Sequence, residues 1–298
     1  MRVLFLGMGG QFTRIVLERL LATGVDVCGL LLSGPELRPL LPEPSPPADP
    51  FNLSLIDSFV EANALHLAWE AGIPVHASGP LAAPELSAHI RQLAPDVACV
   101  ACFDRIIPAR VLALPGHGFL NVHPSRLPDF RGPEPLFWQF RAGVNPVGVT
   151  VHWMDAGLDT GDIAAQTAVS LPDGISGGEA DDLCAAAGGD LLAAVLAQLA
   201  EGSAERRAQP TGGSYQPSPG AGDFALDIGW GARRAFNFMR GTGEWGMAYS
   251  IKVGDQEWRL STALSWEPGV TDGRRPEISG DLLRLPLADG WLAAVLDR

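Results

Sequence analysis

The 298-residue sequence predicts an α/β fold with a doubly wound, mostly parallel sheet, followed by a smaller C-terminal module that is mainly β and OB-like. Strand-sized apolar runs alternate with segments of helical spacing, as repeated β-α units require. The runs Arg2–Gly7 and Val25–Leu32 are apolar at almost every position, which is typical of parallel strands covered on both faces. Short strand-like runs after residue 222 predict the β module.

The elements of the first domain follow in chain order. Gln11–Ala22 is expected to be a helix because Phe12, Val16 and Leu20 lie on one face. Gly34–Pro50 is rich in proline and acidic residues, so we expect a surface loop without regular structure. The other expected helices are Leu53–Ala71, Ala83–Leu93, Pro108–Ala113, Pro133–Ala142 and Gly178–Leu199, and the other expected strands are Ile73–His76, Asp96–Cys102, Gly118–His123, Val147–His152 and Asp162–Ser170.

The chain is expected to divide into a first domain over residues 1–202, a linker over 203–222 and a small β-rich domain over 223–298. The linker is polar and full of Gly, Ser and Pro. The last domain is expected to hold one helix and four short strands: Gly231–Arg240, then Ala248–Val253, Gln256–Ala263, Leu282–Leu287 and Trp291–Leu296. Its tryptophans are interpreted as core residues of a small barrel, with stacking on nucleic-acid bases as the alternative.

The composition is acidic, with 21 Lys and Arg against 34 Asp and Glu and a net charge of -13 at pH 7. Because non-specific nucleic-acid binding depends mainly on attraction to phosphates, such a chain is a poor non-specific binder, although a local basic patch could still serve a tRNA. No run approaches the ~18 apolar residues of a membrane span, and the N-terminus has no small-residue cleavage site. We therefore expect neither a membrane partner nor a signal peptide.

The four cysteines are predicted to be buried structural residues in a reducing cytoplasm. Cys99 and Cys102 form a CxxC, but they lie in an apolar strand-like run. Positions three apart in a strand point to opposite faces and lie ~10 Å apart, which is too far for a disulfide. No Cys or His pair has zinc spacing, so no metal is expected.

The turn Gly7-Met-Gly-Gly10 after the first strand suggests a dinucleotide loop, but the pattern fails twice. G-x-G-x-x-G needs a third glycine where this chain has Phe12, and no acidic residue follows the second strand. We interpret the turn as a tight strand-to-helix connection. A nicotinamide-dependent enzyme is the alternative, which an NADH fluorescence titration would test.

A stronger candidate site combines an amide, an imidazole and a carboxylate. Asn121 and His123 are two residues apart at the carboxyl end of an expected strand, so their side chains share one face. Pro124, Pro128 and Gly132 then predict a rigid, irregular loop. Asp159 lies in a Gly-rich loop between two later strands. Each residue alone is more often structural, but together at this edge of an α/β sheet they can polarise a carbonyl, hold an oxyanion and move a proton.

These stretches resemble the folate-dependent formyltransferase family, which includes methionyl-tRNA, glycinamide ribonucleotide and sugar-nucleotide formyltransferases and formyltetrahydrofolate hydrolases. Asn-x-His-x-Ser-x-Leu-Pro over 121–128 and Gly-Leu-Asp-x-Gly over 157–161 carry the resemblance. It covers residues 1–200, and a weaker similarity to the C-terminal β-barrel module of methionyl-tRNA formyltransferases continues to residue 298.

The resemblance implies formyl transfer from 10-formyltetrahydrofolate to an amine, with no metal. Asn121, His123 and Asp159 take the places of the family's catalytic Asn, His and Asp. We expect Asn121 and a protonated His123 to bind the formyl oxygen while Asp159 favours the charged form of His123. The resemblance places the donor against Phe103, Asp104, Ile106, Ile107, Pro108, Met154, Gly157 and Leu158, and gives a substrate loop of Ser125, Arg126, Leu127, Pro128, Arg131 and Gly132. Ser125 is interpreted as a hydroxyl that fixes this loop rather than as a nucleophile.

Two departures from the family pattern bear on whether the formyl acceptor is a small amine or a tRNA. Arg126 stands where a Leu is common, and Gly34–Pro50, which tRNA-reading members make strongly basic, carries Arg38 against Glu36, Glu43 and Asp49. Residues 131–138 and 148–152 also resemble sugar-nucleotide formyltransferases. We therefore expect a small amine, such as an amino sugar nucleotide, ahead of charged initiator tRNA. Formyltetrahydrofolate hydrolysis and a non-catalytic folate-binding module are the further alternatives.

Overall fold

The computed structural model describes residues 1–42, 63–271 and 273–297, which form two compact units. The first comprises Met1–Arg131, Gly148–Thr167 and Asp182–Gly213, and the second comprises Gly132–Val147, Ala168–Asp181 and Ser214–Arg298. Residues 203–213 of the expected linker thus belong to the first unit. The division at residues 202 and 222 stays a prediction.

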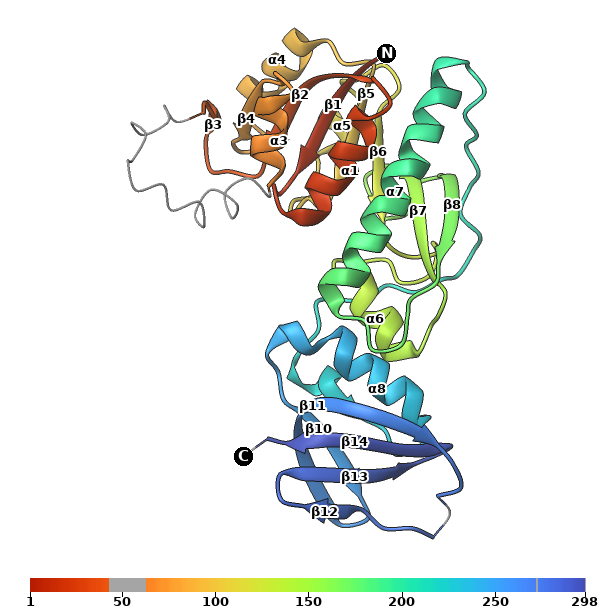
Figure 1. Cartoon of the computed structure of the whole chain (residues 1–298). Coiled ribbons are helices and arrows are strands. Elements are labelled where there is room, and N and C mark those ends of the chain that lie inside the picture. Colours follow the sequence, from red (N-terminus) through yellow and green to blue (C-terminus); the bar gives the residue numbers. More distant parts are fainter. Residues whose placement is uncertain (43–62, 272, 298) are drawn as a thin grey trace, which may run out of the picture. The chain divides into compact units, whose positions relative to one another are not determined.

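The large sheet has eight strands in the order β3-β4-β2-β1-β5-β6-β7-β8 (Figure 1). Its pairings β4-β2-β1-β5-β6 are parallel, whereas β3 pairs antiparallel with β4 and β7 antiparallel with β6. The fold class is therefore confirmed as α/β with a mostly parallel sheet. The strands are β1 (Arg2–Gly7), β2 (Asp26–Leu32), β3 (Leu37–Pro39), β4 (Val75–Ser78), β5 (Val97–Ala101), β6 (Phe119–His123), β7 (Val147–Trp153) and β8 (Ile163–Val169).

The central strands are apolar because both faces of the sheet are covered. Every residue of β5 and β7 is buried, as are all but the first residues of β1 and β2. The helices of the first unit are α1 (Gln11–Leu21), α3 (Ala64–Glu70), α4 (Pro84–Leu93), α5 (Ala109–Leu112) and most of α7 (Gly177–Ala200), whereas α6 (Pro135–Ala142) belongs to the second unit. Local signals set the ends of α4, which starts at Pro84 and stops at Ala94 in the left-handed region, with φ 47°.

The expectation of a wholly irregular loop over Gly34–Pro50 is wrong at residues 37–39. These residues form β3, and Leu37, Arg38 and Pro39 pair with Ser78, Ala77 and His76 of β4. Pro39 is tolerated because β3 is the edge strand of the sheet, where a missing N–H leaves no inner ladder broken. Residues 43–50, and the first part of the helix expected over Leu53–Ala71, lie outside the described residues.

Helix α7 is apolar enough, by length and composition alone, to cross a membrane, and it is the one such helix among the described residues. Its glycines show how it packs here. A Cβ at Gly188 would overlap the Val122 side chain, and one at Gly189 would lie 2.7 Å from Cβ of Arg19 in α1. Only glycine allows this close approach of α7 to β6 and α1, so α7 is a packed helix of the domain core.

The second unit contains a six-stranded sheet in the order β12-β13-β14-β11-β10-β9, which confirms a mainly β module. The OB-like detail is not confirmed. The unit holds α8 (Ala232–Gly241), two 3₁₀ turns (Ala221–Phe224 and Gly243–Trp245), and strands β9 (Ala225–Leu226), β10 (Tyr249–Val253), β11 (Gln256–Pro268), β12 (Glu277–Ser279), β13 (Leu282–Leu287) and β14 (Gly290–Leu296).

Aromatic rings form the core of the second unit. Phe137 of α6 lies 5.2 Å from Phe224 and 5.5 Å from Phe238, both edge to face. Trp230 and Trp291 are buried, whereas Trp245 is 41% exposed although its ring lies 5.5 Å from Phe137. Two of the tryptophans thus fill the core, as the interpretation of this region expected.

None of the four cysteines, all of which lie in the described residues, forms a disulfide, and Cys28, Cys99 and Cys184 are buried. The expectation of burial is wrong for Cys102, which is exposed just past the end of β5 with φ 58°. The strand ends at Ala101, so Cys102 leaves the sheet instead of continuing into its covered interior.

Candidate functional site

The carboxyl end of β6 presents Asn121 and His123 on one face, as their spacing predicts. The antiparallel strand β7 pairs with β6 so that Asn121 lies opposite His152. Nδ2 of Asn121 and Nε2 of His152 are 3.1 Å apart. The register of two strands thus brings a second histidine, fully buried, against the predicted amide.

The hydrogen bonds of His152 fix the orientation of the Asn121 carboxamide. Nδ1 of His152 lies 3.0 Å from the Trp153 carbonyl oxygen, so Nδ1 carries the proton and donates it. In a neutral ring Nε2 is then an acceptor, and Asn121 must present its NH₂ to it. The second N–H of that NH₂ remains to be directed at a ligand.

His123 is buried, with a hydrogen bond at one ring nitrogen and a carboxylate facing the other. Nε2 lies 3.0 Å from the Phe130 carbonyl oxygen, to which it donates, and Nδ1 lies 3.8 Å from Oδ1 of Asp159. Burial lowers the pKa of His123, and this effect exceeds the opposing attraction of Asp159. The pKa shift therefore opposes the expected protonation of His123, because the desolvation cost of the imidazolium is larger than the gain from a carboxylate at 3.8 Å.

Asp159 is oriented by an unusual backbone conformation. Its φ is 54°, in the left-handed region that aspartate tolerates better than most residues. Its carboxylate lies 3.8 Å from Nδ1 of His123 and 3.6 Å from Nε2 of His152. Within the loop that carries Asp159, Oδ1 of Asp155 accepts hydrogen bonds from the Gly157 N–H and the Thr160 hydroxyl.

The three predicted groups therefore converge, and two residues that sequence reasoning did not assign join them. His152 had a usable signal, since pairing β7 antiparallel against β6 places it beside Asn121. Gln209 had none, because its segment has the composition of a linker. Its Nε2 donates to the carbonyl oxygens of Asp159 and Gly161, at 2.7 and 2.8 Å.

The loop after β6 is held by its own polar groups. Ser125 is buried, and its hydroxyl donates to the Asp129 carbonyl oxygen at 2.8 Å, as a loop-fixing hydroxyl would. Gln166 donates to the carbonyl oxygen of Leu127, and Arg131 donates to Oε1 of Gln209. The remaining residues expected in this loop differ in exposure: Arg126 is exposed, Pro128 is half-buried, and Gly132 is buried with φ 117°.

The residues expected around the donor divide between a core and a surface. Phe103, Ile107 and Met154 pack on one hydrophobic cluster, whereas Ile106 is 67% and Leu158 44% exposed. Asp104 accepts a hydrogen bond from the Ser33 hydroxyl at 2.6 Å. Pro108 is the N-cap of α5, and a Cβ at Gly157 would overlap the Thr160 hydroxyl.

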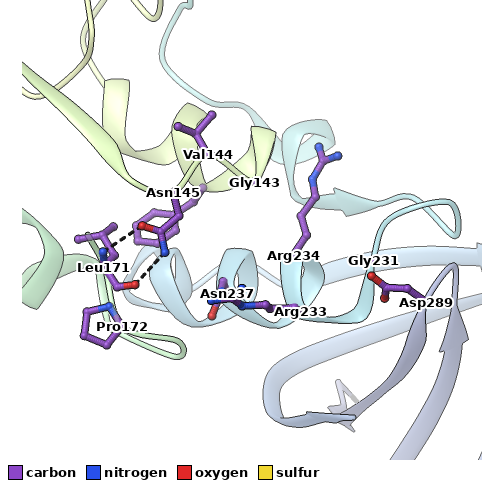
Figure 2. Close-up of a pocket in the computed structure, with 11 residues that line it drawn as sticks. Gly143, Val144, Asn145, Leu171, Pro172, Gly231, Arg233, Arg234, Asn237 and Asp289 are labelled. Carbon is purple, nitrogen blue, oxygen red and sulfur yellow. Dashed lines mark hydrogen bonds between the residues drawn. The ribbon is translucent and has the colours of Figure 1, made fainter. Parts of the chain in front are cut away.

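A cavity of about 350 Å³ lies in the second unit (Figure 2). Its polar groups are engaged with protein atoms: Asn145 exchanges two hydrogen bonds with the Leu171 backbone, and Arg233 pairs with Asp173. Asp289 accepts from the N–H of Ala232 at the start of α8. No predicted catalytic, donor or loop residue lines this cavity.

Metal binding has no visible support in the described part of the chain, where no group of three His, Cys, Asp or Glu is arranged to hold an ion.

Comparisons with known proteins point to one family. A family model described as "Formyl transferase" matches residues 54–196. The methionyl-tRNA formyltransferase of Bordetella petrii is 35% identical over 251 residues, which is 81% of this chain and 75% of that protein. The enzyme of the same name from Clostridioides difficile is 37% identical over 185 residues, 62% of this chain and 60% of that protein, so this match spans less than two thirds of that relative.

Among solved structures, an N-formyltransferase from Helicobacter canadensis, in complex with folinic acid and dTDP-3-aminofucose, has a TM-score of 0.64. Its sequence identity is 16%, and the match covers 99% of each chain. At this identity the likeness shows the fold alone.

Proposed function

From its membership of the folate-dependent formyltransferase family, and as an N-formyltransferase, we infer what this chain does. We propose that it transfers the formyl group of 10-formyltetrahydrofolate to a small amine such as an amino sugar nucleotide. The observation that supports this most is the convergence of Asn121, His123 and Asp159 at the carboxyl end of β6. Four cysteines without a disulfide agree with a reducing cytoplasm as the compartment.

Asn121 supplies the hydrogen-bond donor for the developing oxyanion. One Nδ2 hydrogen is committed to His152, and that bond aims the other. When bound, 10-formyltetrahydrofolate supplies the electrophilic formyl carbon, and attack by the amine places negative charge on the formyl oxygen. A single fixed donor of this kind contributes about 2.7–4 kcal/mol to lowering a barrier.

His123 and Asp159 handle the proton that the amine loses. Because burial keeps the ring neutral and Nε2 donates to Phe130, Nδ1 is the unprotonated nitrogen and faces Asp159. His123 therefore begins as a base at Nδ1. Once it holds the proton, Asp159 stabilises the imidazolium, and Nδ1–H becomes a second donor for the oxyanion. The bond between the formyl carbon and N10 then breaks as the carbonyl re-forms, and His123 returns the proton to N10 of the departing tetrahydrofolate.

The residues beside the site fit a flat, apolar donor. Ile106 and Leu158 expose large side chains, and Phe103 and Met154 pack, partly buried, against the hydrophobic cluster. Asp104, Pro108 and Gly157 would then shape the edge of the same surface.

Charge favours the small amine as acceptor. The chain carries a net charge of -13, and a tRNA acceptor depends on attraction between phosphates and basic residues. Charged initiator tRNA is the second candidate because the relatives from Bordetella petrii and Clostridioides difficile are named methionyl-tRNA formyltransferases.

The test supplies the purified protein with 10-formyltetrahydrofolate and, in parallel, amino sugar nucleotides, other small amines, methionyl initiator tRNA or water alone. Formyl product and tetrahydrofolate are measured together. We expect formylation of a small amine, and we expect His123→Ala to slow turnover by about 10²-fold or more while the exposed control His117→Ala matches the parent. Formate release without any amine would instead identify a hydrolase, and folate binding without turnover would identify a binding module.

A further inference from the structure

The segment that follows α7 runs back along the first unit instead of leaving it. Arg207 exchanges two backbone hydrogen bonds with Ile163, the first residue of β8, at 2.7 and 3.0 Å. The indole of Trp153 donates to the Glu205 carbonyl oxygen, and the Arg206 guanidinium lies 3.8 Å above the same ring. This stretch, which has the composition of a linker, is thus fixed beside the strand that follows the Asp159 loop.

Gln209 uses its whole carboxamide at the end of this stretch. Nε2 donates to the carbonyl oxygens of Asp159 and Gly161, and Oε1 accepts from Nε and a terminal nitrogen of Arg131, at 3.1 and 2.6 Å. A neutral amide is the side chain that offers two donors on one side and an acceptor on the other. One residue therefore joins the loop after β6 to the loop after β7.

The hydrogen bonds to Asp159 and Gly161 act where the backbone needs support. Asp159 has φ 54°, and a non-glycine residue in this region costs on the order of 1–3 kcal/mol unless its surroundings hold it. Asp155 braces the loop from inside through Gly157 and Thr160. Gln209 adds a hydrogen bond from a distant segment, to the carbonyl oxygen of Asp159 itself. The backbone conformation of Asp159 that this bond supports directs the Asp159 carboxylate toward His123.

We propose that Gln209 is a positioning residue that holds the Asp159 carboxylate against His123 through the Asp159 and Gly161 carbonyls. The proposal rests on the proposed function, in which Asp159 stabilises the protonated His123. Without Gln209 the loop that carries Asp159 loses the hydrogen bonds to the Asp159 and Gly161 carbonyl oxygens, and the Asp159 carboxylate moves away from Nδ1 of His123. Displacement of a reacting group by about 1 Å can reduce a rate 10²-fold, so kcat should fall far more than the KM values rise.

The variants are Gln209→Ala, which removes every contact, and Gln209→Glu, which keeps the acceptor for Arg131 but turns a carboxylate oxygen toward two carbonyls. Gln198→Ala, at an exposed position of α7, is the matched control. We expect kcat to fall about 10- to 100-fold in both Gln209 variants, with the KM values for donor and amine within about threefold of the parent. The control should match the parent.

A second readout does not depend on turnover. The titration midpoint of the His123 imidazole is followed by NMR in the parent, Gln209→Ala and Gln198→Ala, with the signal assigned by its loss in His123→Ala. The titratable groups facing His123 are Asp159 and His152, and Asp159 raises its pKa while His152 lowers it. Release of the Asp159 carboxylate should therefore move the midpoint to lower pH in Gln209→Ala alone.

The outcomes separate the two proposals. A lower midpoint with reduced kcat supports the positioning role. An unchanged midpoint in a folded Gln209→Ala overturns it, whatever happens to kcat, and so does parental kcat in both variants. If the parent protein transfers no formyl group to any acceptor, the proposed function fails, while the NMR titration still decides whether Gln209 holds Asp159 against His123.

Discussion

Replacement of His152 gives the sharpest test of how the site orients its amide. His152→Phe keeps an aromatic ring in the buried position but removes both nitrogens. The Asn121 NH₂ then loses its acceptor at 3.1 Å, and the carboxamide can turn over and present its oxygen to the site. His152→Gln is the matched variant, because its side-chain oxygen can still accept from Asn121.

The magnitude follows from the two consequences of that loss. A neutral hydrogen bond contributes about 0.5–1.5 kcal/mol, which corresponds to about a 2- to 12-fold change. A carboxamide that has turned over loses the oxyanion donor as well, which corresponds to about 10²–10³-fold. Because the turned form is populated only in part, we expect kcat to fall about 10- to 100-fold in His152→Phe and less than about 10-fold in His152→Gln.

Initial rates of tetrahydrofolate formation measure kcat, and a thermal melt of each variant separates lost orientation from lost folding. KM for the donor should change little, since the substitution acts on the hydrogen bond between His152 and Asn121. A folded His152→Phe variant with parental kcat would refute the argument that His152 orients the oxyanion donor.

Three further predictions concern a carboxylate, the buried histidines and the cysteines. Asp159→Asn should reduce kcat about 10²–10⁴-fold in steady-state assays, because an amide cannot stabilise the imidazolium of His123, whereas Asp190→Asn on the exposed face of α7 should not. Burial lowers the pKa of His123, His76 and His89, so the unfolded chain binds more protons than the folded protein as pH falls below about 6.5. The free energy of unfolding, measured in urea, should therefore be smaller at pH 5.5 than at pH 7.5. An equal or larger value at pH 5.5 would contradict this. Iodoacetamide should label the native protein at Cys102, the exposed cysteine, because burial shields Cys99 and raises the pKa of the Cys99 thiol. Labelling of Cys99 before Cys102, measured by mass spectrometry, would contradict the burial of Cys99.

Much of the fold and part of the site depend on local pattern. Continuous apolar runs such as Val97–Ala101 form buried strands because only a covered sheet removes them from water. Asn121 and His123 share a face because side chains alternate along a strand. The carboxyl-end position of both residues follows from the order of β-α units, so the sequence alone located the two side chains correctly.

The tertiary structure decided the rest, because those features depend on residues distant in the chain. The register of β7 against β6 placed His152 on Asn121, and no spacing within either strand contains that register. Gln209 reached Asp159 because its segment folds back onto β8, although its composition is that of a linker. The lowering of the His123 pKa follows from burial, which is a property of the packed interior and cannot be read from an imidazole and a carboxylate 36 residues apart in the sequence.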